Sequence, residues 1–315
     1  MKSFLNLFRH PIMQAPIGSA SSVELARAVT NAGGIGSVAL TWHTPEQAVA
    51  CVEELNASTQ GAYAVNYVCT FDCPSLAKVL ETGVPIVTLS WGMPKLAIAQ
   101  VKATKTVLGL QVGSPEGARA AADLGADFII CQGFEAGGHV QSSTPLIPLL
   151  KSVGALDLGL PLVATGGIAD AQDVRRVLSA GASVAALGTR FLVASESAAH
   201  PDYQQAIIAA TDGEPVFTVC FDGDWPYSGS RVLRNRTLAR WEAAGCPPTG
   251  QRPGEGDLIA TTRSGFEVPR YHISSPVNTT RGDVLDLALY AGSGSGRITG
   301  VEDAADIVAD LIANL

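Results

Sequence analysis

The amino-acid sequence predicts an α/β fold, a (β/α)8 or TIM barrel, with a small subdomain appended near its C-terminal end. Three observations carry this prediction. Short apolar runs alternate with amphipathic stretches along the first two-thirds of the 315 residues. The runs are continuously apolar, which is typical of parallel strands covered on both faces. There are eight of them, the number that such a barrel requires.

Each expected strand ends before a polar or glycine-rich turn. The eight expected strands are Pro11–Pro16, Gly36–Leu40, Ala62–Val68, Pro85–Ser90, Thr106–Val112, Phe128–Gln132, Leu162–Thr165 and Val184–Gly188. An open, doubly wound sheet is the alternative, because a strand count alone does not establish closure.

Helices are expected between and after these strands. They are Ser22–Asn31, Pro45–Asn56, Ser75–Glu81, Pro94–Lys102, Pro115–Leu124, Pro145–Ser152, Ala171–Ala180 and Ser195–Thr211. Several begin with a hydroxyl cap followed by proline, as at Thr44-Pro45 and Ser114-Pro115. Several end in a glycine suited to a left-handed C-cap, such as Gly33 and Gly181.

The composition changes after residue 211 to a stretch rich in Gly, Pro and Arg. We therefore expect three parts. Residues 1–211 form the barrel, residues 212–300 form an appended subdomain that covers the substrate, and residues 301–315 form a helix that packs back on the barrel.

Charge and composition exclude several classes of protein. The formal net charge is −8 and there is no basic run, which argues against nucleic-acid binding. No apolar run reaches the roughly 18–20 residues of a membrane span. The first ten residues are too short and too polar for a signal peptide. Six scattered cysteines, without a paired His or Cys motif, indicate free thiols in the cytoplasm and no metal site.

The working residues of such barrels lie at the carboxyl ends of the strands. Phe128–Gln132 is followed by a glycine-rich loop that ends at His139. Gln132 offers a donor and an acceptor to a heteroaromatic ring, and Gly137 and Gly138 permit close approach of a ligand. His139 stands where a general acid or base belongs. The alternative is a glycine-rich turn with a solvent-exposed histidine.

Two further loops predict a phosphate-binding cup. Gly166 and Gly167 follow the seventh strand, and Gly188 and Thr189 follow the eighth. Backbone amides, a hydroxyl and helix N-termini at these places attract phosphate. The alternative is a pair of tight turns. Arg190 either adds charge to the cup or pairs with an acidic neighbour.

Other strand ends contribute weaker candidates. They are Ala15, Pro16 and Ile17 after the first strand, Asn66 in the third and Gln111 in the fifth. For the two amides, a buried side chain satisfied by the backbone is an equal alternative. For the other histidines, His10, His43, His200 and His272, a structural or surface role is favoured.

Taken together, several of these segments resemble the nitronate monooxygenase family, formerly called 2-nitropropane dioxygenases. The segments are Gln14–Pro16, Asn31–Gly36, Gln132–His139, Gly166–Asp170 and Gly188–Phe191. The resemblance covers nearly the whole chain. It implies a TIM barrel with non-covalent FMN and His139 as the catalytic residue facing the flavin. It also implies oxidation of alkyl nitronates, such as propionate 3-nitronate, with O2.

Two other interpretations of the sequence stay open beside this resemblance. FMN-dependent type II enoyl-ACP reductases share these motifs, so an NAD(P)H-dependent flavin reductase acting on an enoyl thioester or quinone is an alternative. A barrel that binds a phosphate ligand without redox chemistry is a third. Several residues depart from the family pattern. Gln141 stands where glycine is usual, Gln111 where a lysine is expected, Ser293 where Gln is common, and Ala171-Gln172-Asp173 where Gly-Arg-Gly is common. A homodimer and the use of NAD(P)H are left open.

Overall fold

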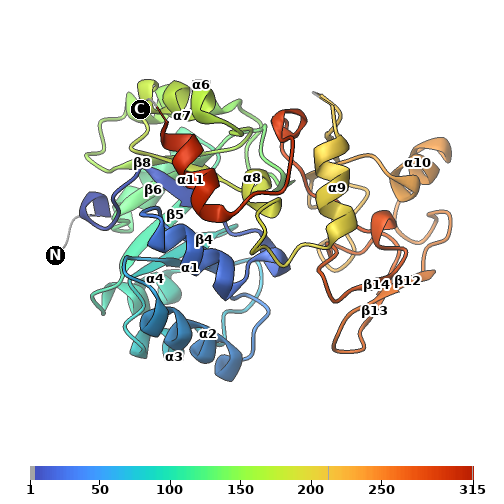
Figure 1. Cartoon of the computed structure of the whole chain (residues 1–315), viewed down its shortest axis with the longest axis horizontal. Coiled ribbons are helices and arrows are strands. Elements are labelled where there is room, and N and C mark those ends of the chain that lie inside the picture. The colour runs from blue at the N-terminus through green and yellow to red at the C-terminus, as the bar shows by residue number, and fades with distance from the viewer. Residues whose placement is uncertain (1–3, 212, 314) are drawn as a thin grey trace.

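The computed structural model describes residues 4–211, 213–313 and 315. Its centre is a parallel eight-stranded sheet, ordered β1-β9-β8-β6-β5-β4-β3-β2 (Figure 1). The strands are β1 (Ile12–Gln14), β2 (Ser37–Ala39), β3 (Ala64–Val68), β4 (Ile86–Ser90), β5 (Val107–Val112), β6 (Phe128–Gln132), β8 (Leu162–Thr165) and β9 (Val184–Leu187). Each lies within a range predicted from the sequence.

The sheet closes between its first and last strands, β1 and β2. Met13 and Ile35 form a parallel bridge there. The buried amide of Gln14 completes the seam, because Nε2 donates to the carbonyl of Ser37 (2.8 Å) while Oε1 accepts from the Ser37 amide (2.9 Å). The barrel prediction is therefore confirmed, and the open-sheet alternative is wrong.

Helices surround the barrel (Figure 1). They are α1 (Val23–Asn31), α2 (Pro45–Ser58), α3 (Leu76–Glu81), α4 (Lys95–Lys102), α5 (Pro115–Asp123), α6 (Leu146–Gly154), α7 (Ala171–Ser179), α8 (Thr189–Leu192) and α11 (Ala304–Ile312). The predicted caps form, since the hydroxyls of Thr44 and Ser114 accept from backbone amides at the starts of α2 and α5.

The eighth predicted helix, Ser195–Thr211, is wrong in its first half. α8 ends at Leu192 and the chain is irregular up to His200. α9 (Pro201–Ala209) then begins at a proline, and His200 caps it by accepting from the Asp202 amide (3.1 Å). The C-terminal α11 packs between α1 and α7 instead. It thus takes the position of the eighth helix around the barrel.

Residues after α9, together with β7 from an earlier loop, form two small sheets. One contains β10 (Val216–Thr218), β11 (Ser230–Val232) and β7 (Gly138–His139), and the other contains β12 (Leu258–Thr261), β13 (Glu267–Pro269) and β14 (Arg281–Gly282). α10 (Arg236–Ala243) packs beside them, and short 3-10 turns cover Phe4–Asn6, Gly18–Ala20, Val284–Asp286 and Ser295–Arg297. Because β7 belongs to the loop after β6, one sheet joins the barrel to the later residues. The boundaries at residues 211 and 300 stay a prediction.

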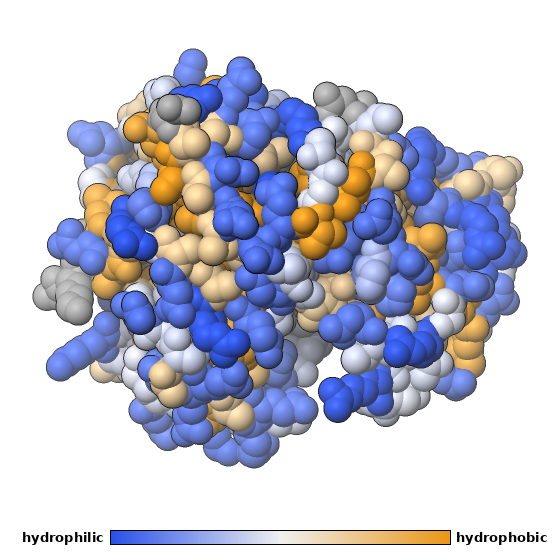
Figure 2. Space-filling model, viewed as in Figure 1, coloured by the Kyte–Doolittle hydropathy of each residue, from blue (hydrophilic) through white to orange (hydrophobic). Residues whose placement is uncertain are grey.

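The lower half of the barrel is filled with apolar side chains. Phe4 stacks on Phe128 with ring centroids 3.9 Å apart and an interplanar angle of 11°. Gly109 faces this ring, and a Cβ at that position would lie 2.2 Å from it. A filled floor leaves space only at the carboxyl ends of the strands. On the face shown in Figure 2, hydrophilic residues cover most of the surface. Within the described residues, no helix has the length and apolarity needed to span a membrane.

Candidate active site

A cavity of about 600 Å³ opens at the carboxyl ends of the barrel strands. All thirteen residues predicted for catalysis or cofactor binding line it, although they come from six strand ends and the glycine-rich loop. They are Ala15, Pro16, Ile17, Asn66, Gln111, Gln132, Gly137, Gly138, His139, Gly166, Gly167, Gly188 and Thr189. The fold therefore brings distant segments into one site.

The loop that carries His139 is fixed from two sides. Gln132, at the end of β6, donates from Nε2 to the carbonyl of His139 (3.1 Å) and accepts at Oε1 from the amide of Gln141 (2.7 Å). From the other side, His139 on β7 stands opposite Ser230 of β11. Gln132 is thus a clamp on the loop, and only one of its amide hydrogens is left for a ligand.

Gly137 has a packing role that the sequence did not reveal. A Cβ there would lie 2.5 Å from the backbone nitrogen of Gly292, so the loop and residues 291–292 could not approach as they do. Gly138 has a φ of +74°, in the left-handed region that favours glycine.

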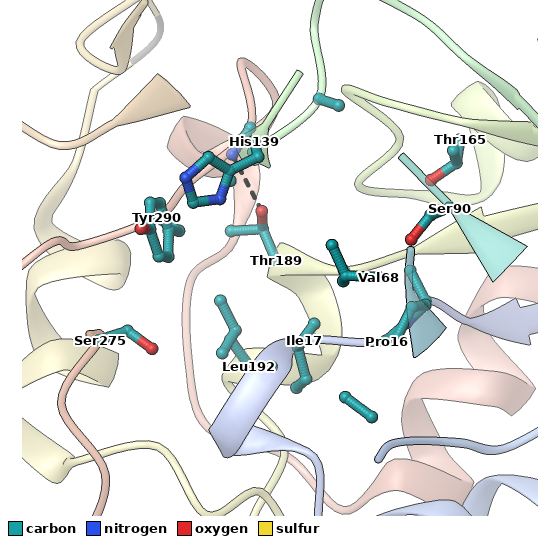
Figure 3. A pocket seen from close by; sticks show the side chains of 18 of the residues that line it. Pro16, Ile17, Val68, Ser90, His139, Thr165, Thr189, Leu192, Ser275 and Tyr290 are labelled. Atoms are coloured by element: carbon teal, nitrogen blue, oxygen red, sulfur yellow. Dashed lines mark hydrogen bonds between the residues drawn. The ribbon is translucent and has the colours of Figure 1, made fainter. Parts of the chain in front are cut away.

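The imidazole of His139 lies among aromatic rings. It stacks on Trp225 with centroids 4.3 Å apart and an interplanar angle of 28°, and Tyr290 lies 5.4 Å away. Figure 3 shows it pointing into the cavity between Tyr290 and Thr189. Nε2 is fully buried and has no hydrogen-bond partner in the described part of the chain. The alternative of a solvent-exposed histidine in a turn is wrong.

Burial lowers the pKa of His139 to about 4, because the charged imidazolium loses its hydration. At neutral pH the ring is therefore uncharged and can accept a proton. No described side chain orients it by a hydrogen bond, so the contacts with Trp225 and Tyr290 hold it.

The loops after β8 and β9, for which a phosphate cup is predicted, both line the cavity. Gly166 and Gly167 have φ values of +123° and +68°, and a Cβ on Gly167 would lie 2.8 Å from both Glu135 and Ser293. Arg297 supports this turn, since its guanidinium bonds Asp170 (2.9 Å) and the carbonyl of Gly167 (3.5 Å).

Two hydroxyls complete the cup. Thr189 Oγ1 accepts from the amide of Gly292 (3.0 Å), which leaves its own hydrogen free to donate (Figure 3). Ser295 was missed by the sequence reasoning, although the small-residue run at 292–296 was a signal for it. Its Oγ is buried, lines the cavity and has no partner among the described residues. Such a hydroxyl, beside backbone amides, fits a phosphate oxygen.

Arg190 does not join the cup. Its guanidinium is buried against the carboxylate of Glu302 (2.5 Å), which settles the two alternatives in favour of a structural pair. None of the described residues that line the cavity is a lysine or an arginine.

The two amides on β3 and β5 are placed differently. Asn66 Nδ2 donates to the carbonyl and the hydroxyl of Thr88 (3.2 and 3.0 Å), which leaves Oδ1 as an acceptor for a ligand N–H. Gln111 Nε2 donates to Gln141 Oε1 (2.6 Å). Two of the residues that depart from the family pattern, Gln111 and Gln141, thus bind each other.

Sequence reasoning also missed the aromatic lining. Trp42, Phe71, Trp91 and Trp225 all line the cavity. They were missed because they lie outside the helices and strands and no spacing in the sequence links them. His272 lines the cavity as well, and its Nε2 lies 2.7 Å from the carboxylate of Asp224. No cluster of three potential metal ligands occurs in residues 4–211, 213–313 and 315.

Comparison with known proteins agrees with this geometry. The sequence model of the nitronate monooxygenase family matches residues 63–314. The chain belongs to the nitronate monooxygenase family. Nitronate monooxygenase of Pseudomonas aeruginosa is 30% identical over 300 residues, covering 78% of this chain and 82% of that one. Members of this family are flavin-dependent oxidoreductases, and so is this chain.

Two solved structures share the whole fold. Nitroalkane oxidase from Streptomyces ansochromogenes superposes with a TM-score of 0.80 at 28% identity, covering 100% of this chain and 98% of that one. FabK from Thermotoga maritima superposes with a TM-score of 0.81 at 26% identity, covering 98% of this chain and 93% of that one. Two proteins with different names thus share this barrel with the chain.

Proposed function

We propose that this protein is an FMN-dependent nitronate monooxygenase that oxidises alkyl nitronates with O2. One observation carries the proposal. The uncharged imidazole of His139, whose Nε2 has no described partner, shares a cavity with a cup of uncharged hydrogen-bond donors that suit a phosphate group. The names of the relatives support it, since they include a nitronate monooxygenase and a nitroalkane oxidase.

The residues present fit FMN. Amides of Gly166, Gly167 and Gly188, with the hydroxyls of Thr189 and Ser295, would hold its phosphate. Asn66 Oδ1 would accept from a ring N–H, and Ala15, Pro16 and Ile17 would support the ring. Bound FMN would supply the redox centre.

His139 is the catalytic residue in this proposal. With a neutral nitroalkane, one of its ring nitrogens would accept the proton from the carbon that bears the nitro group. Nε2 is enclosed by protein, so Nδ1 is the nitrogen that would take it. The resulting imidazolium would then lie beside the newly formed nitronate and stabilise its negative charge.

Further parts of the proposal concern partners and location. The substrates are a small molecule and O2, the location is cytoplasmic, and residues 212–300 cover the substrate. A homodimer and the use of NAD(P)H stay open.

The proposal is tested on the purified protein. It should be yellow, and anaerobic mixing with an alkyl nitronate should bleach the flavin within seconds. A His139→Ala variant should keep its FMN but lose turnover of neutral nitroalkanes. A flavin that keeps its spectrum at millimolar nitronate would contradict the proposal.

The match to FabK favours a second candidate, an NAD(P)H-dependent flavin reductase acting on an enoyl thioester or a quinone. NADH alone would then bleach the flavin without oxygen.

A further inference from the structure

Aromatic side chains are concentrated in the cavity. They make up only 6% of the chain, yet three of the four tryptophans, Trp42, Trp91 and Trp225, line this one space. With Phe71 they form a continuous series of ring contacts, which we call the aromatic wall. Its centroid distances are 5.7 Å (Trp42–Phe71), 5.2 Å (Phe71–Trp225) and 4.7 Å (Trp91–Trp225).

The aromatic wall extends from the surface to the catalytic residue. Trp42, at the outer end, is 54% exposed, and at the inner end Trp225 stacks on the imidazole of His139. Trp91 adopts a φ of +56°, a strained conformation for a residue with a side chain. Strain of this kind persists where the surroundings require it, frequently at ligand sites. Trp225 and Trp91 thus lie beside the imidazole of His139, with ring centroids 4.3 and 6.2 Å from it.

The charges around the cavity are as informative as the rings. Among the described residues on its wall there is no lysine or arginine, and the carboxylate of Asp224 lies at the wall with 73% of its side chain exposed. The chain as a whole carries a net charge of −8. The basic side chains on the described wall are His139 and His272, and His272 Nε2 already lies 2.7 Å from the Asp224 carboxylate. A carboxylate on a substrate would therefore find no lysine or arginine here and would lie near the charge of Asp224.

The geometry points to a substrate with a flat apolar body, an aryl or bulky alkyl nitronate, and against one that also carries a carboxylate, such as propionate 3-nitronate. The aromatic wall binds this apolar body. Within the wall, Trp225 is the specificity-determining residue, because its ring contacts Phe71, Trp91 and the imidazole of His139. The nitronate part of this inference rests on the proposed function. The preference for a flat, apolar body does not.

Binding is tested without turnover. Calorimetric titration of the anaerobic holoenzyme with nitrobenzene and with 4-nitrobenzoate, neither of which has a hydrogen on the carbon that bears the nitro group, should give a Kd at least about tenfold lower for nitrobenzene. Trp225→Ala should weaken nitrobenzene binding about tenfold, and Trp225→Phe, which keeps a ring and guards against misfolding, should stay within about threefold. The matched control is Trp241→Phe on α10, the tryptophan outside the cavity, which should leave both Kd values unchanged. Equal or tighter binding of 4-nitrobenzoate, or no effect of Trp225→Ala, overturns the inference.

Turnover separates this inference from the proposed function. The value of kcat/KM should be higher for the nitronate of phenylnitromethane than for propionate 3-nitronate, and Trp225→Ala should reduce that ratio. A preference for propionate 3-nitronate overturns the inference and leaves the function standing. If neither nitronate is oxidised, the proposed function fails, and the titration still decides what the aromatic wall binds.

Discussion

Acidification should destabilise this protein through His139. The folded imidazole has a pKa of about 4, compared with 6.5 for an ordinary histidine. Between these two values the unfolded chain takes up a proton that the folded chain does not. The free energy of unfolding must therefore fall as the pH falls through this window, and the stability is fully present only above pH 6.5.

The magnitude follows from the two pKa values. At pH 4.5 the unfolded histidine is almost fully protonated and the folded one is mostly not, so the loss attributable to His139 is about 2.5 kcal/mol. The assay is urea unfolding followed by circular dichroism at pH 7 and pH 4.5, on the wild type and on His139→Phe, whose ring cannot titrate. The variant should lose about 2.5 kcal/mol less than the wild type on acidification.

A second variant tests the cause. Trp225→Ala removes the ring that covers the imidazole, so water should reach His139 and its pKa should rise towards 6.5. The acid-induced loss should then shrink in Trp225→Ala as well. If His139→Phe loses as much stability as the wild type, burial of His139 is not what lowers its affinity for protons.

Three other changes give distinct outcomes. Ser295→Ala should raise the Kd for FMN about tenfold by fluorescence titration, with apoprotein stability unchanged because Oγ has no described protein partner. Gly137→Ala should abolish flavin binding or proper folding, seen as colourless or aggregated protein, since its Cβ would lie 2.5 Å from the Gly292 nitrogen. Glu302→Gln should lower stability by about 1–3 kcal/mol in urea unfolding, because it leaves the buried Arg190 charge without its carboxylate, while the Kd for FMN stays the same. A higher Kd for FMN in Glu302→Gln would indicate that Arg190 does contribute to phosphate binding.

The barrel was predictable because its signals are local. Continuous apolar runs and caps such as Thr44 and Ser114 act over a few residues, so the strands fall within their predicted ranges. Strand ends of a barrel meet at one face, which explains why Asn66 and Gly188 could be assigned to one cavity from the sequence. The same locality explains the error in the eighth helix, where Pro201 starts a new helix and tertiary packing gives α11 the last place in the ring.

The aromatic wall was not predictable for the opposite reason. Trp91 and Trp225 are far apart in sequence and lie on irregular loops, so no spacing links them, and only the fold sets their rings 4.7 Å apart. The pair formed by Gln111 and Gln141 is similar, since each looks like an isolated departure until the hydrogen bond between them is seen.

The pairing of β7 with β11 has a consequence for chimeras. His139 keeps its register opposite Ser230, so residues from outside the barrel determine which way its side chain points. A slip of one residue in β11 would send the side chains of β11 to the opposite face and change which residue stands opposite His139. Swapping residues 212–300 for those of a relative, in order to change which substrates are accepted, would therefore also change the support behind His139. Transplants that preserve this two-residue contact should retain turnover, and those that do not should bind flavin without using it.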